Sequence, residues 1–248
     1  PDPIEALTTK RIFQVQGQTI LIEPRQCSPM CIADLSYRYL ISLNLIFLSV
    51  SHRFLLSCCR EASASSSTSP EETRLVADFF LGLADICDLL IIPGNHDCNL
   101  NNKSREDVLS PIIDLVKQID PNIHYWKKSG VYELGDCQFG FLSVFDITKE
   151  GKPNIKNLPK ASDIKGDNKI AVYHGGVGRF EVDTGMWMSD DVVKSTYFDG
   201  YDLVLLGDIH KRQFLNDEET IAYPGSLIQQ NFAEAPEHGF LFWDVEKR

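Results

Sequence analysis

The chain has 248 residues, of which 43% are hydrophobic and 24% charged, and its formal net charge is −11. This composition is that of an ordinary globular protein with a deep core, which excludes a disordered, a collagenous or a disulfide-scaffold protein. The acidity does not favour general attraction to a polyanion, so any contact with nucleic acid would have to be local or metal-mediated.

The first quarter of the chain differs from the rest. It holds one of the 16 glycines and four of the seven cysteines, and a serine-dense run covers residues 63–69. With only one glycine the segment has few tight-turn signals. Regular α/β elements are therefore hard to place there. We therefore treat residues 1–68 as an atypical N-terminal segment, which is either genuine or else degraded or non-native, and residues 69–248 as the core. A frameshift, a wrong exon or a misassembled gene would produce this change.

The cysteines and the apolar runs bear on the compartment. Seven cysteines, an odd number, with no CxxC pair predict buried thiols and an intracellular protein of the cytoplasm or the nucleus. The most apolar run, residues 39–51, would span roughly 20 Å as a helix, which is too short to cross a membrane. We interpret this run as core, or as sequence foreign to the fold.

Regular elements are predicted from Ser69 onward. Ser69 and Pro70 mark the start of a helix, because apolar residues then recur at helical spacing. The apolar run over residues 87–92, closed by Pro-Gly, predicts a buried strand.

A second helix and then a series of strands are expected. Ser104 and Asp107 resemble a capping box, and Pro111 is expected to kink the helix or delay its start. Residues 147–168 are polar and predict a surface excursion. Short apolar or alternating runs closed by Gly, Asp or Pro predict strands over residues 131–134, 138–145, 169–173, 202–206, 220–223 and 239–245. Helices first and strands later predict a layered α/β domain with mixed sheets.

Three of the predicted strands end in polar clusters. The sequences GNHD, HGG and GDIH occupy residues 94–97, 174–176 and 207–210. The ends of strands are where α/β folds assemble their sites. Asn, Asp and His together supply the oxygen and nitrogen donors that suit Mn²⁺, Fe²⁺ or Zn²⁺. The three clusters therefore predict a metal site.

The same residues carry a family resemblance. The motifs PGNHD (93–97), YHGG (173–176) and LGDIH (206–210) resemble, in order and strand context, the later motifs of calcineurin-like metallophosphoesterases. The tail AYPGSL (222–227) is similar to that of SbcD-like DNA break-repair exonuclease subunits, which partner an SMC-type ATPase. The resemblance implies a calcineurin-like core over residues 69–248, an αββα sandwich in which two mixed sheets are flanked by helices.

The resemblance also implies an activity: a hydrolase that cleaves phosphodiesters as a DNA exonuclease or endonuclease subunit in break repair. Its cofactors would be two divalent ions, Mn²⁺ foremost, about 3.5–4 Å apart, which hold a hydroxide for in-line attack. Its partners would be DNA and an SMC-type ATPase subunit, with a homodimer as a further possibility and no membrane. The metal ligands carried over are Asn95, His174 and Asp208 for one ion and His210 for the other.

The resemblance gives the neighbouring residues roles as well. His96 would stabilise or protonate the leaving oxygen, and Asp97 would fix the ring of His96. Three cations beside the site would contact phosphate or DNA, or else form solvated surface: Lys211, Arg212 and Arg179. The three tryptophans are expected to pack against other side chains rather than to act as base-stacking platforms, although Trp187, which follows the glycine-rich turn after His174, could lie near a groove.

The sequence lacks the N-terminal motifs that would complete the expected metal site. The family opens with Asp-x-His and then with Gly-Asp-x-x-Asp, whose Asp bridges both ions, and residues 1–68 hold no acceptable copy of the second motif. Asp34 is a candidate for the first, with Ser36 where the family has His. Two dications at about 4 Å repel by on the order of 16 kcal/mol at an effective dielectric of 20. Without the bridging carboxylate, one ion or none is expected.

Three functions remain open at this point. The first is the nuclease. The second is a catalytically impaired relative that acts as a binding or assembly module, and the third is a small-molecule phosphodiesterase. Pro93 before the Gly-Asn-His sequence and Asp97 after it depart from the protein phosphatases of the superfamily, which have Arg and Glu there.

Overall fold

The computed structural model describes residues 11–15, 18–22, 43–49, 54–60, 70–85, 87–100, 102, 105–226 and 240–245, and before Pro70 it describes the backbone alone. The chain divides into two compact units, Pro1–Tyr39 and Leu40–Arg248. In the first unit, β1 (Arg11–Val15) and β2 (Gln18–Ile22) pair as an antiparallel hairpin. Asp34 lies outside the described residues.

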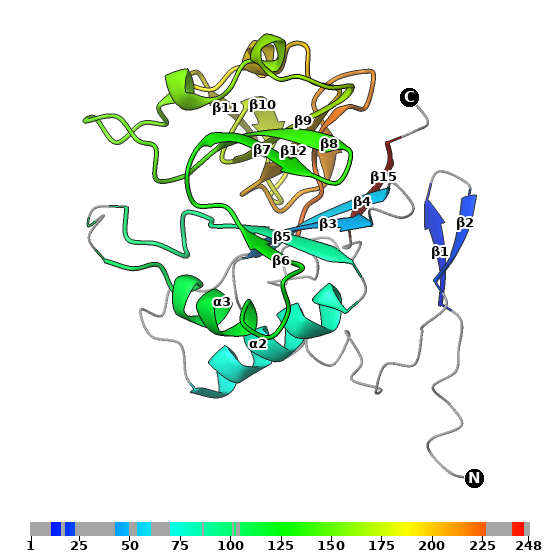
Figure 1. Ribbon diagram of the computed structural model, residues 1–248. Coiled ribbons are helices and arrows are strands. Elements are labelled where there is room, and N and C mark those ends of the chain that lie inside the picture. The colour runs from blue at the N-terminus through cyan, green and yellow to red at the C-terminus, as the bar shows by residue number, and fades with distance from the viewer. Residues whose placement is uncertain are drawn as a thin grey trace. The chain divides into compact units, whose positions relative to one another are not determined.

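Two mixed sheets dominate the described part of the second unit (Figure 1). The six-stranded sheet has the order β13 (Gln213–Phe214), β14 (Ile221–Tyr223), β12 (Leu203–Gly207), β9 (Asn168–His174), β8 (Cys137–Leu142) and β7 (Gly130–Leu134). The five-stranded sheet has the order β15 (Leu241–Asp244), β4 (Phe54–Arg60), β3 (Leu43–Ser49), β5 (Asp88–Ile92) and β6 (Ile123–Tyr125). β10 (Gly178–Glu181) and β11 (Trp187–Asp190) form a separate hairpin. The prediction of an α/β chain with mixed sheets is confirmed.

The first helix follows its sequence signals, and the second starts late. α2 (Pro70–Ala84) begins at the predicted proline. α3 (Ser110–Val116) begins six residues after Ser104, so the predicted capping box at Ser104 is wrong. Pro111 sits in the first turn of α3, where its missing N–H costs nothing, and the Oδ1 atom of Asp107 instead accepts hydrogen bonds from the backbone N–H groups of Leu109 and Ser110.

Every strand that the sequence predicts is present, whereas β6, β10, β11 and β13 were not predicted. Each of the six runs predicted after residue 130 contains a strand, and β8 ends at Leu142, earlier than expected. The apolar run over residues 39–51 supplies β3, which pairs with β4 on one side and with β5 on the other. A central strand of a covered sheet is typically a continuous apolar run, which explains the composition of this segment.

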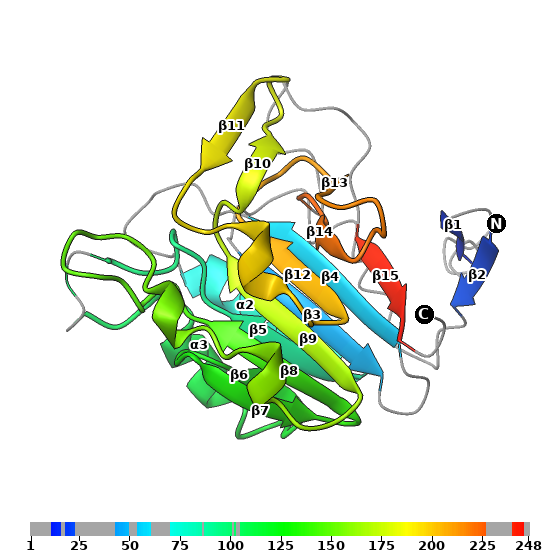
Figure 2. The same cartoon turned by 90° about the horizontal axis from the view of Figure 1, so that it is seen from above.

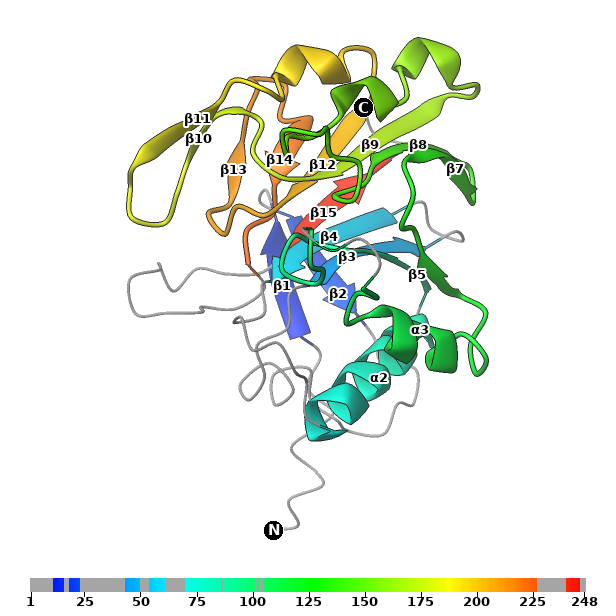
Figure 3. The ribbon, with the colours of Figure 1, turned by 90° about the vertical axis from the view of Figure 1, so that its left-hand side faces the viewer.

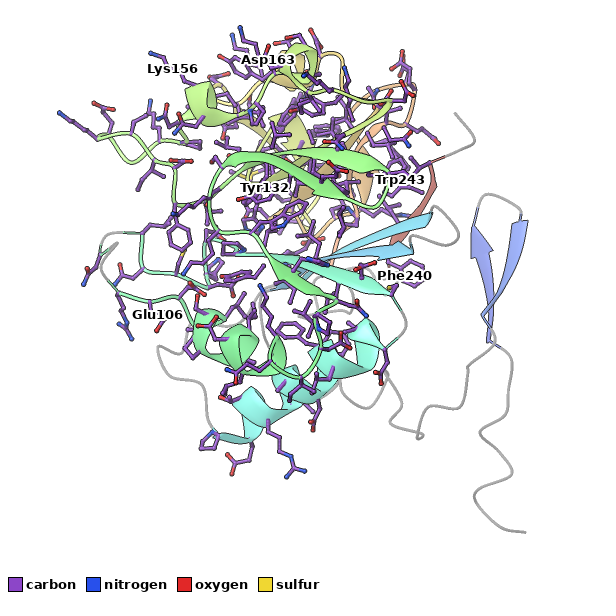
Figure 4. All side chains as sticks on the ribbon, viewed as in Figure 1. Glu106, Tyr132, Lys156, Asp163, Phe240 and Trp243 are labelled. Atoms are coloured by element: carbon purple, nitrogen blue, oxygen red, sulfur yellow. The ribbon has the colours of Figure 1, made fainter. Side chains whose placement is uncertain are left out.

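The two sheets stack as layers, with α2 and α3 beyond the five-stranded sheet (Figure 3). Side chains alternate between the two faces of each strand, so the core is divided between these layers. Phe139, Phe141 and Leu205 are buried between the two sheets, where Tyr132 also packs (Figure 4). α2 and α3 cover the other face of the five-stranded sheet. The other face of the six-stranded sheet is covered by short 3-10 turns at Ile155–Asn157, Ala161–Asp163 and Ser195–Phe198.

The predicted surface excursion, residues 147–168, supplies part of this cover. Leu158 is buried against the sheet and Ile164 is buried as well, whereas Lys156 and Asp163 project outward (Figure 4). None of the helices that the structure describes combines the length and the apolar character needed to cross a membrane.

Candidate metal centre

The candidate site is built where strands of both sheets end. β9 ends at His174, and its parallel neighbour β12 ends at Gly207, which is the register partner of His174. The backbone N–H of Gly175 donates to the carbonyl of Gly207 at 3.3 Å, so the segments that leave β9 and β12 start side by side. Asn95 follows β5 of the other sheet. Residues far apart in the sequence are thereby brought to one place.

Three of the predicted ligands meet there. The Nε2 atom of His174 lies 3.0 Å from Oδ1 of Asn95 and 3.6 Å from Oδ1 of Asp208. The Nδ2 group of Asn95 donates to Oδ1 of Asp208 at 3.2 Å. The side chain of His174 is fully buried, and that of Asp208 is 24% exposed. An imidazole nitrogen, an amide oxygen and a carboxylate oxygen thus converge at one point that solvent reaches from the side of Asp208.

The backbone of Asp208 is strained. Its φ angle is +88°, in a region that residues other than glycine rarely adopt. Such strain persists only where the surrounding structure enforces it, and it is concentrated at functional sites. The conformation turns the chain directly after β12 and aims the carboxylate at His174.

His210, the predicted ligand of a second ion, has a different neighbour. Its Nδ1 atom lies 3.9 Å from Oδ2 of Asp183, in the turn between β10 and β11. Among the described residues, no three His, Cys, Asp or Glu side chains form a cluster able to bind a metal ion. The triad of Asn95, His174 and Asp208 differs from such a cluster because one of its donors is an amide.

The loop between β5 and α3 holds the two predicted proton-transfer residues. His96 is exposed, whereas Asp97 is buried and its Oδ2 atom accepts the backbone N–H of Gly94 at 2.8 Å. Burial, followed by the charge of Asp97, raises the pKa of the Cys98 thiol to about 12. Cys98 therefore stays protonated and donates to the carbonyl of Gly94 at 3.4 Å. The role of Asp97 in fixing His96 stays a prediction.

The predicted phosphate-contacting cations have varied surroundings. The Nζ atom of Lys211 forms a 2.6 Å ion pair with Oε1 of Glu181, and Arg212 is exposed. The guanidinium carbon of Arg179 lies 4.5 Å from the ring centroid of Trp187. Trp187 itself is 55% exposed, so it is not a core residue, and its ring packs against Arg179.

Tyr223 supports the site from behind, a role that the sequence did not indicate. It is fully buried at the end of β14, and its hydroxyl donates to the carbonyl of Gly175 at 2.8 Å. Burial raises its pKa well above the ordinary range, so the hydroxyl stays a donor. The turn that follows His174 is therefore held by a contact 48 residues away in the chain. The motif AYPGSL, which contains this tyrosine, was the available signal.

Gly225 holds the other side of the site. Its φ is +77°, and a Cβ atom there would lie 2.6 Å from the carbonyl oxygen of His210 and 2.9 Å from the backbone nitrogen of Arg212. The next residue, Ser226, donates its N–H to the same carbonyl at 3.0 Å. Only glycine allows this close approach of the two backbone segments.

We expect Gly225→Ala to destabilise the protein by clearly more than the roughly 1–2 kcal/mol of a left-handed alanine, because backbone atoms have to move. The matched control is Gly151→Ala, at φ +75° with open space around the added methyl group. Urea unfolding of both variants measures the difference. Equal losses of free energy would show that the clash at Gly225 is relieved at little cost.

The chain is similar in sequence to an uncharacterized viral protein. No family model matches the chain. Over 189 residues the chain is 42% identical to Uncharacterized protein R555 of Acanthamoeba polyphaga mimivirus. The match covers 73% of this chain and 13% of that protein, so the chain spans a small part of the length of the relative it matches. The related segment therefore occurs in a much longer viral protein.

Proposed function

We propose that the chain is a metal-dependent phosphodiesterase of the DNA break-repair nuclease type, built on the αββα sandwich of calcineurin-like metallophosphoesterases. The observation that carries the proposal is the meeting of Asn95, His174 and Asp208 from the ends of three strands, two in one sheet and one in the other. A carboxylate with strained backbone beside a buried imidazole is an arrangement that needs a functional reason.

The three donors fit one divalent cation. A nitrogen and two oxygens suit Mn²⁺, Fe²⁺ or Zn²⁺, and a positive ion there would offset the partly buried charge of Asp208. When bound, the ion supplies Lewis-acid polarisation of a phosphate and lowers the pKa of water. We propose Mn²⁺ as this ion, and His210 as the candidate ligand for a second one.

The chain's own groups would handle the phosphodiester and its protons. Hydrolysis adds water to phosphorus and breaks one P–O bond, and the leaving oxygen must take up a proton. His96 follows Asn95 directly and is exposed, so its ring can reach a leaving group and deliver that proton. Arg212 is exposed two residues after His210 and can bind a flanking phosphate.

A second candidate function is a binding or assembly module that has lost catalysis. The specific observation in its favour is that residues 1–68 hold no acceptable copy of the Gly-Asp-x-x-Asp motif, whose second-position Asp would bridge two ions. The nuclease proposal extends to DNA as substrate, to an SMC-type ATPase partner, to a homodimer and to an intracellular location. A small-molecule phosphodiesterase is the variant of the same chemistry with a different substrate.

The test is metal analysis of the purified chain combined with a cleavage assay on linear duplex and single-stranded DNA. We expect bound Mn²⁺ and Mn²⁺-stimulated cleavage that EDTA abolishes. A chain that binds no divalent ion and cleaves neither substrate would rule out the enzyme and leave the binding module. Cleavage restricted to cyclic nucleotides would point to the small-molecule activity.

A further inference from the structure

The β10–β11 hairpin carries a concentration of exposed apolar side chains. Figure 2 shows it projecting away from the strands of both sheets. Three consecutive residues at its tip, Met186, Trp187 and Met188, are 60%, 55% and 47% exposed. Scattered single apolar residues on a surface are ordinary, but three large ones in succession, facing both sides of one projecting hairpin, are not, and such exposure is typical of a binding element.

One face of the hairpin places a cation against the tryptophan. Trp187 is the register partner of Glu181, and Ser189 is the partner of Arg179, so these side chains share a face. The Arg179 guanidinium lies 4.5 Å from the centroid of the Trp187 ring. The cation holds the indole in place while more than half of the side chain stays open to solvent.

The hairpin is anchored directly to the candidate metal centre. A Cβ atom on Gly176, two residues after His174, would lie 2.9 Å from Cε1 of Phe180, so the hairpin packs on the turn that leaves β9. On the other side, Gln213 exchanges two hydrogen bonds with the backbone of Glu181, at 2.9 and 2.8 Å. The Lys211–Glu181 ion pair adds a link on the Trp187 face itself.

We propose that Trp187, backed by Arg179, is a stacking platform for an unpaired nucleobase next to the phosphodiester held at Asn95, His174 and Asp208. The inference rests on the proposed function and adds the substrate class, which is single-stranded nucleic acid. Every base has a flat face that an exposed indole can stack on, whereas a duplex hides those faces.

Charge favours stacking over electrostatic docking. The hairpin and its end carry Asp183, Asp190 and Asp191, and the net charge of the chain is −11, so the surface does not attract a duplex as a polyanion. Binding by stacking releases few counterions, so the affinity should depend only weakly on salt.

The first experiment is a fluorescence titration with short oligothymidylate in EDTA, which removes catalysis from the measurement. Trp126 is buried and stacked on Tyr132, and the indole N–H of Trp243 is buried, so Trp187 is the tryptophan that a bound base quenches. We expect quenching with the single strand and much less with a blunt duplex. Trp187→Ala is expected to lower the affinity, measured by anisotropy of labelled oligothymidylate, about tenfold.

Further variants separate stacking from structure. Trp187→Phe should retain part of the affinity, and Arg179→Gln should lose part of it. The matched control is Ile119→Ala, which removes an exposed apolar side chain after α3 (70% exposed) and should leave affinity unchanged. Equal affinity of Trp187→Ala and Ile119→Ala would overturn the inference. So would a monomer–dimer shift caused by Trp187→Ala without any quenching, which would make the surface an interface between copies.

The second experiment ties the platform to the site. Thymidine 5′-p-nitrophenyl phosphate and methyl p-nitrophenyl phosphate share the same leaving group. The first carries thymidine where the second carries a methyl group, so only the first offers a base to the platform. In Mn²⁺, Trp187→Ala should lower the ratio of their kcat/KM values about tenfold. An unchanged ratio would overturn the link between the platform and the site. Absence of hydrolysis of both substrates by the unaltered chain would count against the proposed function, whereas the titration in EDTA decides the binding inference by itself.

Discussion

Replacing His174 by alanine is expected to abolish Mn²⁺ binding and phosphodiester cleavage together. The imidazole is fully buried and lies within 3.0 and 3.6 Å of the other two donors, so no other described side chain takes its place. Loss even of an outer partner of a metal ligand lowers affinity 10- to 100-fold, so we expect a loss of at least about 100-fold here. Calorimetric titration with Mn²⁺ and the cleavage assay measure the two effects.

Asn95→Ala provides the check on folding, because its half-buried side chain leaves a smaller cavity than that of His174. It should lose both functions while its circular dichroism stays that of the parent chain. The control histidine is His124, which pairs with Asp88 at 3.1 Å on β6, and His124→Ala should retain both functions. Full Mn²⁺ binding by Asn95→Ala and His174→Ala would place the site elsewhere.

Asp107→Asn is expected to cause the largest loss of stability among single substitutions of polar residues in the loop before α3. The fully buried carboxylate pairs with Nζ of Lys127 at 2.6 Å, and it accepts hydrogen bonds from the hydroxyls of Ser110 and Tyr125 at 2.7 and 2.8 Å. Breaking a buried pair costs 3–5 kcal/mol, and we expect about 3 kcal/mol because Lys127 is partly exposed. Urea unfolding at neutral pH measures this loss.

The pH dependence of that loss has a definite sign. Burial tends to raise the pKa of Asp107, but the hydrogen bonds from Lys127, Ser110 and Tyr125 outweigh it and hold the pKa below its ordinary value. The stabilisation is therefore complete above the unfolded-state pKa of about 3.9 and disappears as the pH falls through the lower, folded-state pKa. The difference between the parent chain and Asp107→Asn should shrink in acid.

The neighbouring Glu106 supplies the matched control, since its side chain is exposed (Figure 4). Glu106→Gln removes the same charge one residue away and should change the free energy of unfolding by less than about 0.5 kcal/mol. If the two variants lost equal stability, the network around Asp107 would contribute nothing beyond its charge.

Elements whose limits are marked by proline, glycine or a clear apolar period lie where the sequence predicts them. α2 has a proline at its first position and a helical apolar period, and β5 is an apolar run closed by Pro-Gly, so both lie where the sequence puts them. β11 was missed because Trp187, Met188 and Ser189 are all exposed, which leaves no alternation to recognise. The strand β3 and its pairing with β4 and β5 were not predicted, because the segment has few glycines to mark turns and strand pairing is not a local sequence property.

The candidate site was predictable to the extent that it lies at strand ends. Asn95, His174 and Asp208 each follow or close an apolar strand, and neighbouring parallel strands bring their ends together. The proximity of His210 to Asp183 was not predictable, because it depends on the position of the β10–β11 turn, which lies 27 residues earlier in the chain than His210. The support of Gly175 by Tyr223 was equally hidden, since it joins residues from separate strands.

The donor triad also joins the two sheets mechanically. Asn95 follows a strand of the five-stranded sheet, whereas His174 ends β9 and Asp208 follows β12, both of the six-stranded sheet. Any sliding of one sheet past the other would pull the amide away from the imidazole, and a ligand shared by all three groups would resist that shear. Binding of a ligand at the site is therefore expected to stabilise the packing of the apolar layer between the sheets.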